Sequence, residues 1–557
     1  MPTSLISRAS ELSSQDAQPV SVAPLTPLSF LKRAAAVFPH SPAVAYGSKS
    51  LSYRELVVAV EKRSTALRNL GVCPGDRVAI MMPNIPEMLF AHFSVPLMDA
   101  ILVPVNTRLA PEEVQYILDH SGSKVLIVDA EYFPEIAPII QELPSLQSVC
   151  IVQDPQQDTA GVAPVTAPVP GVVWFEEFVA SVAESEERFS WTVDDENGPI
   201  SINYTSGTTG KPKGVVYSHR GAYLNAMNQI LHSGFNSDSV YLCTLPMFHC
   251  NGWCTPWALV AVGGLQICLR YVRGDAIWNL FNQGVTHLNG APTVVNMIKN
   301  ARAAHGLPRR ITITSGGAPL SPRSLEEMES LGFSILHIYG LTETYGPYSV
   351  CQPQPGWVDM SAATRASIQA RQGVQMVLSD RLRVVTIDSS GSDTLLDVPA
   401  DGVTMGEVMM RGNTVMTEYF RDDAATKAAF SGGWFHSGDL GVMHSDGYIE
   451  LRDRSKDIII SGGENISTIE LEHAIAAHPD VLEVAVIGIP DEHWGERPKA
   501  FITTRHASDL NAESVRLFLT GRISKFKIPS EVAFVEELPK TGTGKVQKFV
   551  LRAGLGA

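Results

Sequence analysis

The chain has 557 residues, too many for one ordinary compact domain of about 100–200 residues. Its 43 Lys and Arg against 58 Asp and Glu leave a net charge of −15, which excludes nucleic acid as the main partner, because Lys and Arg supply most of the affinity for phosphate backbones. Hydrophobic residues make up 45% of the chain, the share of a folded protein and not of a disordered one.

The seven cysteines are few, odd in number and without paired C-x-x-C motifs, which predicts a reducing compartment and no structural zinc. Cys250 and Cys254 have the spacing of half a metal site, but we expect two buried thiols. The apolar run 253–269 contains Pro and Gly and is too short to span a bilayer, so it predicts buried core. Residues 1–25 lack the apolar stretch of a signal peptide, and the final LRAGLGA is not an S-K-L type signal. We therefore expect a loose N-terminal tail and a cytoplasmic protein.

Predicted strands and helices alternate through the first two hundred residues. Ser52 and Glu55 have the spacing of a capping box, which predicts a helix through Leu70. Pro86 and Pro111 each begin a further helical stretch, and residues 200–204 alternate in polarity as a half-buried strand does. Short apolar segments predict strands at 78–81, 102–105 and 125–128. This order predicts an α/β fold of parallel or mixed sheets covered by helices.

The amino-acid composition changes at two places in the second half of the chain. Residues 386–406 are rich in turn residues and predict connections between strands of a β-subdomain, after a surface helix at 361–372. Beyond the charged run 453–457, a second capping-box pattern at Ser467 and Glu470 predicts a helix through Ala477, followed by a strand at 484–487 and a helix at 511–519. We predict a tail at 1–25, a large domain at 26–452, a hinge at 453–457 and a small, mobile α+β domain at 458–557.

The strongest local signal is the segment 204–214, with three glycines, four small hydroxyl side chains and two lysines. Glycines let backbone N–H groups approach phosphate oxygens, hydroxyls donate to them, and lysines supply charge. A Walker loop is excluded, because Thr205 stands where its first glycine belongs and Pro212 follows Lys211. The segment 539–545 fails the same test at Pro539 and Val546. We predict a phosphate-binding loop; the alternative is a ligand-free Gly/Thr hairpin.

Six motifs in order resemble those of the adenylate-forming superfamily, which includes acyl-CoA synthetases, firefly-type luciferases and peptide-synthetase adenylation domains. They lie at 204–214, 339–343, 434–440, 453–456, 462–466 and 539–545, and the resemblance extends from about Leu25 to the end of the chain. It implies the reaction of an acyl-CoA synthetase, in which a carboxylic acid, ATP and CoA give acyl-CoA, AMP and pyrophosphate through an acyl-adenylate. The partners it implies are small molecules, with Mg²⁺ as the metal and a monomer or homodimer as the assembly.

The resemblance also implies an ATP site. Tyr339 would stack on adenine, Asp439 would accept from the ribose hydroxyls, and Glu343 would hold Mg²⁺, which prefers oxygen ligands. Lys545 would bridge the α-phosphate and the attacking carboxylate. The residues assigned to ATP or AMP are Thr205, Ser206, Gly207, Thr208, Thr209, Gly210, Lys211, Gly317, Ala318, Pro319, Tyr339, Gly340, Thr342, Asp439, Arg454 and Lys545. Without the resemblance, Arg454 and Lys545 would be interpreted as solvated linker or surface-turn residues, whereas the place of Glu343 between two threonines after a Tyr-Gly turn favours a metal ligand over a solvated loop glutamate.

The remaining assignments concern the acid, CoA and domain movement. The catalytic set implied is Lys545, Thr342, Glu343 and His249, but we expect Phe248 or His249 to shape and gate the pocket and not to act as a base, because carboxylates are already ionised. The acyl pocket is assigned to Phe248, His249, Asn251, Gly252, Trp253, Ser315 and Gly316. CoA is assigned to Ser461, Gly462, Gly463 and Glu464, and the hinge to Lys456.

The acid itself is less defined by the sequence. The segment 351–374 resembles plant and bacterial acyl-activating enzymes, which implies a short- or medium-chain fatty acid or a benzoate- or cinnamate-type acid. We expect Trp253 to shorten the pocket and disfavour long chains. The alternatives are a hydroxycinnamate–CoA ligase and an AMP- or acyl-binding relative without turnover.

Overall fold

The computed structural model describes residues 21–156, 172–182, 189–205, 211–386, 395–454, 456–462, 464–505, 508–541 and 545–554. Most of the predicted tail lies outside these ranges. So do Ser206, Gly207, Thr208, Thr209 and Gly210 of the phosphate loop, part of the 386–406 segment, and Gly463.

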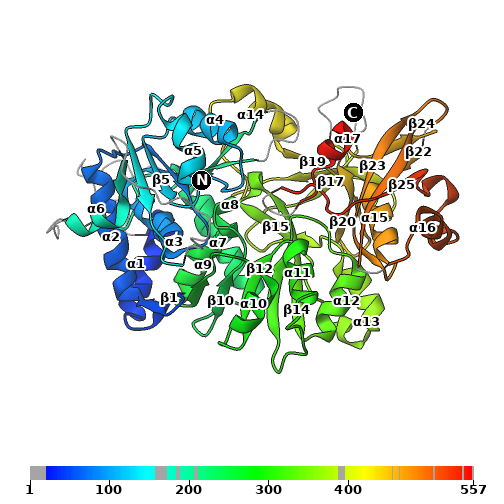
Figure 1. The fold of residues 1–557 in the computed structure, drawn as a ribbon, viewed down its shortest axis with the longest axis horizontal. Helices are drawn as coiled ribbons and strands as arrows, with labels where there is room; N and C mark the ends of the chain where they lie inside the picture. The colour runs from blue at the N-terminus through cyan, green and yellow to red at the C-terminus, as the bar shows by residue number, and fades with distance from the viewer. Residues whose placement is uncertain are drawn as a thin grey trace, which may run out of the picture.

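The described strands form four sheets, two of which make up the body of the molecule (Figure 1). One has seven strands in the order β7-β6-β5-β3-β4-β8-β9, and the other has nine in the order β16-β15-β14-β13-β12-β10-β11-β1-β2. The seven are β3 (Arg77–Met81), β4 (Ile101–Pro104), β5 (Val125–Asp129), β6 (Ser148–Val152), β7 (Val172–Trp174), β8 (Pro199–Tyr204) and β9 (Gly214–Ser218). The nine are β1 (Pro42–Tyr46), β2 (Lys49–Ser52), β10 (Val240–Cys243), β11 (Leu265–Cys268), β12 (His287–Gly290), β13 (Ile311–Ser315), β14 (Phe333–Leu341), β15 (Gly346–Val350) and β16 (Val374–Gln375).

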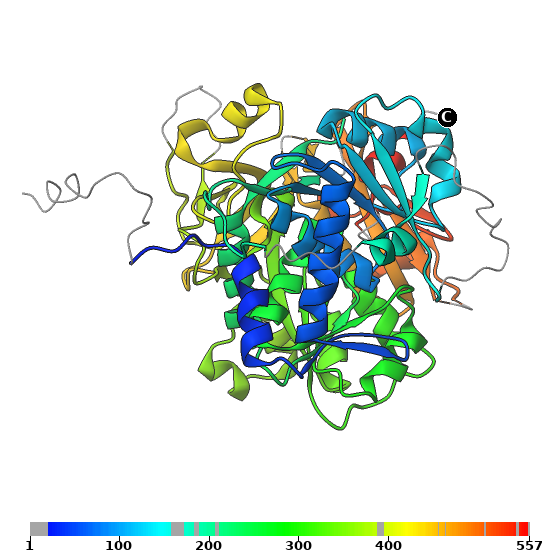
Figure 2. The ribbon, with the colours of Figure 1, turned by 90° about the vertical axis from the view of Figure 1, so that its left-hand side faces the viewer.

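Helices cover these sheets, as the sequence predicts, and in Figure 2 α1 and α2 lie in front of them. The inner strands pair in parallel, for example β3 with β4 and with β5, while β9 and β15 pair antiparallel with their neighbours. The helices are α1 (Leu28–Val37), α2 (Tyr53–Asn69), α3 (Pro86–Ser94), α4 (Pro111–Ser121), α5 (Phe133–Ile140), α6 (Phe175–Ser181), α7 (His219–Ser233), α8 (Cys250–Trp253), α9 (Thr255–Val262), α10 (Gly274–Phe281), α11 (Pro292–Lys299), α12 (Pro322–Ser330), α13 (Ala362–Gln369) and α14 (Asp423–Ala429). The predicted α/β fold class is confirmed.

The two smaller sheets follow in sequence. An antiparallel four-stranded sheet contains β17 (Arg383–Val385), β18 (Met405–Met410), β19 (Phe435–Met443) and β20 (Ile449–Arg454). The C-terminal sheet contains β21 (Ile459–Ser461), β22 (Glu464–Ile466), β23 (Val481–Asp491), β24 (Gly495–Thr504) and β25 (Glu531–Phe534). It packs with α15 (Thr468–Ala476), α16 (Ala512–Leu519) and α17 (Lys548–Ala553), and its own core includes Ile459, Leu471 and Ile502. This unit lies at the right of Figure 1.

The local helix signals are largely confirmed. Ser52 and Glu55 form the predicted reciprocal capping box, which satisfies backbone N–H groups that the first turn of α2 leaves unpaired. Ser467 accepts from the backbone N–H of Glu470, but the return half of that box is absent, because Glu470 forms an ion pair with Lys527. The segment 200–204 is a strand, but its side chains are buried on both faces, and the half-buried prediction was wrong because packed structure covers the sheet on both sides at β8.

A buried charge network joins the two large sheets. The guanidinium of Arg270, two residues beyond β11, donates to Asp129 at 2.8 Å on both amino groups and to Asp154 at 2.7 Å. Asp129 ends β5 and Asp154 follows β6, so the network spans the boundary between the sheets. The side chains of Arg270 and Asp154 are 2% exposed and that of Asp129 is 0% exposed, so removing either sign of charge would strand the other in the interior.

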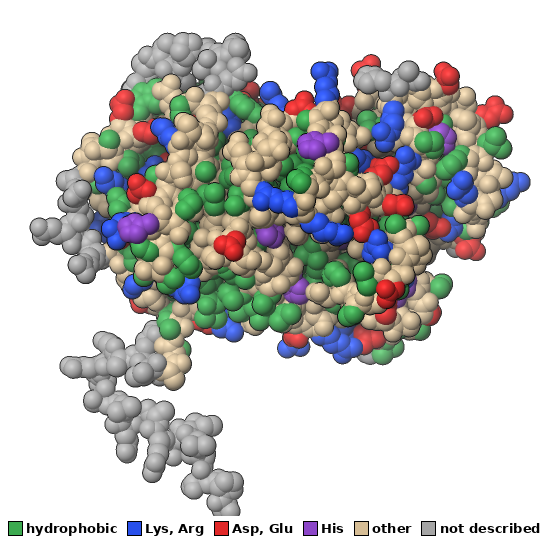
Figure 3. Space-filling view, turned by 90° about the horizontal axis from the view of Figure 1, so that it is seen from below, with side chains coloured by type: hydrophobic (Ala, Val, Ile, Leu, Met, Phe, Trp, Pro, Cys, Tyr) green, Lys and Arg blue, Asp and Glu red, His purple; other side chains and the backbone are tan. Residues whose placement is uncertain are grey.

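Predictions about cysteines and surface charge can also be compared with the structure. Cys250 and Cys254 are both free and buried, as expected, and no cluster of metal-ligating side chains occurs among the described residues. No helix in the described ranges is both long and apolar enough to cross a bilayer. Acidic and basic side chains intermix on the face shown in Figure 3. This distribution fits a protein whose partners are small molecules.

Candidate active site

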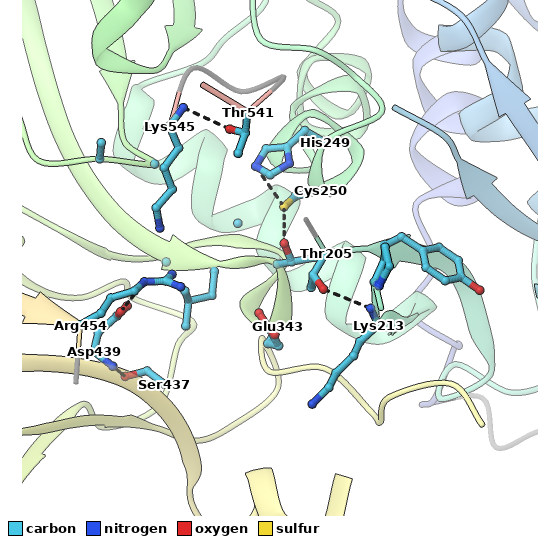
Figure 4. Close-up of a pocket in the computed structure, with 18 of the residues that line it drawn as sticks. Thr205, Lys213, His249, Cys250, Glu343, Ser437, Asp439, Arg454, Thr541 and Lys545 are labelled. Atoms are coloured by element: carbon cyan, nitrogen blue, oxygen red, sulfur yellow. Dashed lines mark hydrogen bonds and ion pairs between the residues drawn. The ribbon is translucent and has the colours of Figure 1, made fainter. Parts of the chain in front are cut away.

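One cavity of about 970 Å³ brings together residues from both ends of the chain. Its wall includes residues of β14, β19, β20 and the segment that carries Lys545 (Figure 4). The predicted site residues that line it are Thr205, Lys211, Phe248, His249, Trp253, Gly317, Ala318, Pro319, Tyr339, Gly340, Thr342, Glu343, Asp439, Arg454, Lys456 and Lys545. Segments separated by up to three hundred and forty residues in sequence therefore share one wall.

The base of the predicted phosphate loop is closed by paired strand ends. The Thr205 backbone N–H donates to the Lys213 carbonyl at 3.0 Å, and the Lys213 N–H donates to the Thr205 hydroxyl at 3.2 Å. The Lys213 ammonium lies 4.5 Å from the Tyr419 ring centroid, and the Lys211 ammonium lies 5.2 Å from that of Tyr116. Aromatic faces thus hold both ammonium groups at the edge of the cavity, where they can meet phosphate oxygens.

Three predicted nucleotide contacts are bonded to one another. The Tyr339 hydroxyl donates to Asp439 Oδ2 at 2.8 Å, and Arg454 Nε lies 3.1 Å from Asp439 Oδ1. Asp439 and Arg454 face each other as Cα partners on β19 and β20, so the antiparallel register sets this ion pair. Burial raises the pKa of Tyr339, which keeps its hydroxyl a donor. A carboxylate has about four acceptor positions, so Asp439 keeps capacity for ribose hydroxyls.

Glu343 lies in a short 3₁₀ turn (Thr342–Thr344) immediately after β14. Its Oε1 accepts from the Tyr419 hydroxyl at 2.8 Å, and the carbonyl of Thr342 accepts from the Tyr217 hydroxyl at 2.6 Å. The carboxylate is half-buried on the cavity wall, a donor set that fits Mg²⁺ together with substrate phosphates. Tyr419 was missed by sequence reasoning, since no local pattern marks a tyrosine that contacts a carboxylate 76 residues away.

Lys545 enters the cavity from the C-terminal part of the chain. Its backbone N–H donates to the Thr541 hydroxyl at 3.1 Å, and its side chain extends toward Arg454 (Figure 4). Burial, followed by the nearby Arg454 charge, lowers the pKa of Lys545 to about 8, while Asp439 and Asp457 oppose the shift. The ammonium forms no hydrogen bond or ion pair within the described ranges, so this cation is positioned for an incoming anion.

His249 borders Lys545 and Cys250. Burial and the Lys545 charge lower the pKa of His249 to about 4, which makes its imidazole neutral near pH 7. Its Nε2 lies 3.7 Å from Cys250 Sγ, which itself lies 3.7 Å from Thr342 Oγ1. A neutral imidazole in contact with Cys250 is compatible with the predicted gating role, which stays a prediction.

The residues after His249 form a left-handed turn. Cys250, Asn251, Gly252, Trp253 and Cys254 have φ angles of 48°, 50°, 57°, 58° and 60°. The left-handed conformation costs non-glycine residues roughly 1–2 kcal/mol each, and such strain persists only where surrounding contacts enforce it. All five residues are buried, so the turn is enclosed by packed structure.

An apolar cluster continues the cavity wall beyond this turn. It contains Leu245, Cys250, Trp253, Leu336, Ile338, Val350 and Met376. Trp253 lies flush against the backbone of Gly346, where an added Cβ would come within 2.5 Å of its Cδ1. Of its members, Cys250, Trp253 and Ile338 line the cavity. Four residues assigned to the acyl pocket, Asn251, Gly252, Ser315 and Gly316, do not line the cavity and lie behind its wall.

Of the residues assigned to CoA, the three that the structure describes, Ser461, Gly462 and Glu464, do not line the cavity. Ser461 and Glu464 pair across the β21–β22 hairpin, while Gly462 donates its N–H to the Trp494 carbonyl at 2.8 Å. Lys456 lies beside Arg454 in the turn between β20 and β21 and lines the cavity. Neither the CoA assignment nor the hinge assignment is tested by this arrangement, and both stay predictions.

The chain is similar to known proteins over most of its length. The AMP-binding enzyme family model matches residues 31–420, and the AMP-binding enzyme C-terminal domain model matches residues 470–545. An acetate–CoA ligase of Humulus lupulus is 42% identical over 548 residues, which cover 95% of this chain and 94% of the relative. A peroxisomal trans-cinnamate:CoA ligase of Petunia hybrida is 38% identical over 539 residues, covering 95% of this chain and 94% of the relative. The ATP-bound structure of MatB from Rhodopseudomonas palustris superposes with a TM-score of 0.80 at 26% identity, covering 95% of this chain and 98% of that one.

Proposed function

Because this chain belongs to the AMP-binding enzyme family and is an adenylate-forming acid–CoA ligase, we propose that its acid is a short- or medium-chain aliphatic monocarboxylate. One observation carries the proposal: Trp253 lines the cavity together with its apolar neighbours Cys250 and Ile338 and packs against the backbone of Gly346. A second carboxylate or an ammonium group on the acid would lose its hydration there without finding a partner.

The acids named for the relatives limit the class of substrate but do not identify one acid for this chain. Ligases of nearly equal identity to this chain are named for acetate and for trans-cinnamate, which differ greatly in size and shape. The alternative acid is therefore a planar aromatic one of the benzoate, cinnamate or hydroxycinnamate type. The position of Trp253 favours the aliphatic acid, since its indole is 3% exposed and leaves no room toward Gly346.

In the first half-reaction a carboxylate oxygen attacks the α-phosphorus of ATP, a P–O bond forms, and the bond to the β-phosphate breaks to release pyrophosphate. Both reactants are anionic, so their approach needs cations in a partly dry site. We assign that task to Lys545, with Arg454 and the ammonium groups of Lys211 and Lys213 on the phosphates. Mg²⁺, held by Glu343, would screen the charge of the phosphates. Tyr339 and Asp439 orient the base and the ribose.

In the second half-reaction the CoA sulfur attacks the acyl carbon, the thiol proton is released, and AMP leaves. We propose that residues 453–457 form the hinge between domains 26–452 and 458–557, and that rotation about Lys456 brings Ser461, Gly462, Gly463 and Glu464 to the cavity. Support comes from Ser461 and Glu464, which pair on the hairpin that follows this turn and do not line the cavity. We also propose that the protein is cytoplasmic.

The test is an acid screen with the full-length enzyme, Mg-ATP and CoA, using straight-chain acids from acetate to palmitate, benzoate, and cinnamates. We expect the highest kcat/KM among the acids of two to eight carbons. Preference for a cinnamate by tenfold or more would select the aromatic alternative. ATP-dependent pyrophosphate exchange without net thioester formation from any acid would instead contradict ligase turnover.

A further inference from the structure

We infer that the side-chain hydrogen bond between Asn203 and Asn251 is the positioning contact that holds the left-handed turn 250–254 and thereby sets where Trp253 ends the acid pocket. This inference rests on the proposed role of Trp253. It concerns two residues that do not line the cavity and would act only through the wall.

The turn needs an external support because its backbone is unfavourable. Five successive residues are left-handed, and four of them carry side chains. Backbone bonds close the turn locally: the Gly252 N–H donates to the His249 carbonyl at 2.9 Å and the Cys254 N–H to the Asn251 carbonyl at 3.1 Å. These bonds fix the curvature of the turn, but they do not anchor it to the rest of the molecule.

Beside the Cys250–Thr342 contact at 3.7 Å, the Asn251 side chain anchors the turn to another part of the chain. Its Oδ1 accepts from Asn203 Nδ2 at 2.7 Å, with the two side chains belonging to residues that are 0% and 1% exposed. Asn203 also donates to the Ser201 hydroxyl at 3.1 Å, so it is itself held on β8. This buried hydrogen bond between two side-chain amides tolerates little displacement: Asn251 Nδ2 has no partner among the described residues, so breaking the bond would leave the whole Asn251 amide unpaired in the interior.

The anchor connects two parts of the site. Asn203 precedes Thr205 by two residues on the strand that leads into the phosphate loop, and Trp253 follows Asn251 by two residues. Because Trp253 is packed flush on the Gly346 backbone, a small rotation of the turn moves the indole along the wall. The Asn203–Asn251 bond thus fixes the depth of the acid pocket relative to the place where phosphate binds.

Asparagine is suited to this position for a conformational reason as well. Asn adopts the left-handed region more readily than most residues, and glycine adopts it with no steric cost. Asn251→Gly therefore removes the amide and keeps the backbone conformation accessible. Asn251→Ala removes the same amide and adds backbone strain, so comparing the two separates the bond from the strain.

The experiment measures selectivity, defined as kcat/KM for butanoate divided by kcat/KM for octanoate, in the full-length enzyme with Mg-ATP and CoA. We expect Trp253→Ala to lower this ratio about tenfold, since one methylene alone is worth about 10–200-fold in a hydrophobic pocket. Asn251→Gly is expected to lower it by a similar factor while the KM for ATP changes less than about twofold. The double variant should match Trp253→Ala alone, because residues that act through one another are non-additive.

Asn228→Ala is the matched control. Asn228 is 0% exposed on α7, accepts from the Leu378 N–H at 2.8 Å, and does not line the cavity. Its loss should lower the melting temperature as Asn251→Gly does and leave the selectivity ratio unchanged. An unchanged ratio in Asn251→Gly alongside a reduced one in Trp253→Ala would overturn the inference, and so would simple additivity in the double variant.

A second measurement does not depend on the acid. Cys250 and Cys254 are 2% and 0% exposed, so labelling of these thiols by a thiol reagent, located by mass spectrometry, reports opening of the turn. Asn251→Gly should label at least about tenfold faster at both cysteines than the parent enzyme or Asn228→Ala. If Trp253→Ala leaves selectivity unchanged, the proposed role of Trp253 fails, while the acid preference is still decided by the acid screen. In that case unchanged labelling of Asn251→Gly would overturn the anchoring contact as well.

Discussion

Replacing Lys545 with alanine removes the buried cation that faces the cavity without a partner among the described residues. Two unit charges about 4 Å apart interact by about 4 kcal/mol at an effective dielectric constant near 20, the value suited to such sites. At about 1.36 kcal/mol per factor of ten in rate, loss of that interaction predicts a roughly thousandfold slower formation of acyl-adenylate. Arg454 stays in place and still screens part of the repulsion between the carboxylate and the phosphate, so some activity should survive.

The assay follows the two half-reactions separately. ATP–pyrophosphate exchange reports adenylate formation, and CoA consumption from synthetic acyl-AMP reports thioester formation, which has no phosphate–carboxylate repulsion to screen. Lys545→Ala should lose the first and keep the second within about threefold. Lys540→Ala is the control, because Lys540 lies five residues earlier, pairs with Glu483 at 2.7 Å and does not line the cavity. Equal loss of both half-reactions in Lys545→Ala would refute the assignment.

Three further outcomes are expected. The pKa of Lys545 is lowered to about 8, so its ammonium loses the proton as pH rises through that value and kcat/KM for ATP should fall above about pH 8. Lys545→Arg should abolish this alkaline decrease in kcat/KM, since arginine stays charged. Lys456→Pro should retain pyrophosphate exchange and lose thioester formation, because proline fixes φ at the proposed hinge; full turnover would contradict the hinge. Arg270→Met should lower the free energy of unfolding by about 3–5 kcal/mol in urea titrations, because it leaves Asp129 and Asp154 unpaired, and adding Asp129→Asn should recover part of the loss.

Much of the fold could be predicted because its signals are local. The Ser52–Glu55 capping box and the proline that begins α3 act through backbone groups within one helical turn, so sequence spacing alone carries the information. The strand at 200–204 was placed correctly and its environment was not. The number of buried faces of a strand depends on which strands and helices lie beside it, and periodicity over five residues does not report that.

In the candidate site, too, some features follow from local motifs and others only from tertiary contacts. Motif order alone indicated the chemistry and sixteen of the cavity-lining residues, since glycines, hydroxyls and lysines that bind phosphate must be close in sequence to form one loop. The sequence also placed the proposed catalytic lysine, Lys545, near the C-terminal end of the chain. It could not show that Tyr419 donates to Glu343, or that Asp439 pairs with both Tyr339 and Arg454. Those contacts join segments from different strands, and their geometry exists only once the sheets are packed.

The segment around Asn251 shows the difference most directly. By itself the sequence determined an apolar, aromatic segment beside the acid and placed Asn251 in the pocket. Tertiary structure decided that five residues turn left-handed, that Asn251 binds Asn203 behind the wall, and that Trp253 meets Gly346. Left-handed backbone is locally unfavourable for residues with side chains, so no local preference predicts it. Only the surrounding packing, assembled from distant parts of the chain, supplies the energy that holds it.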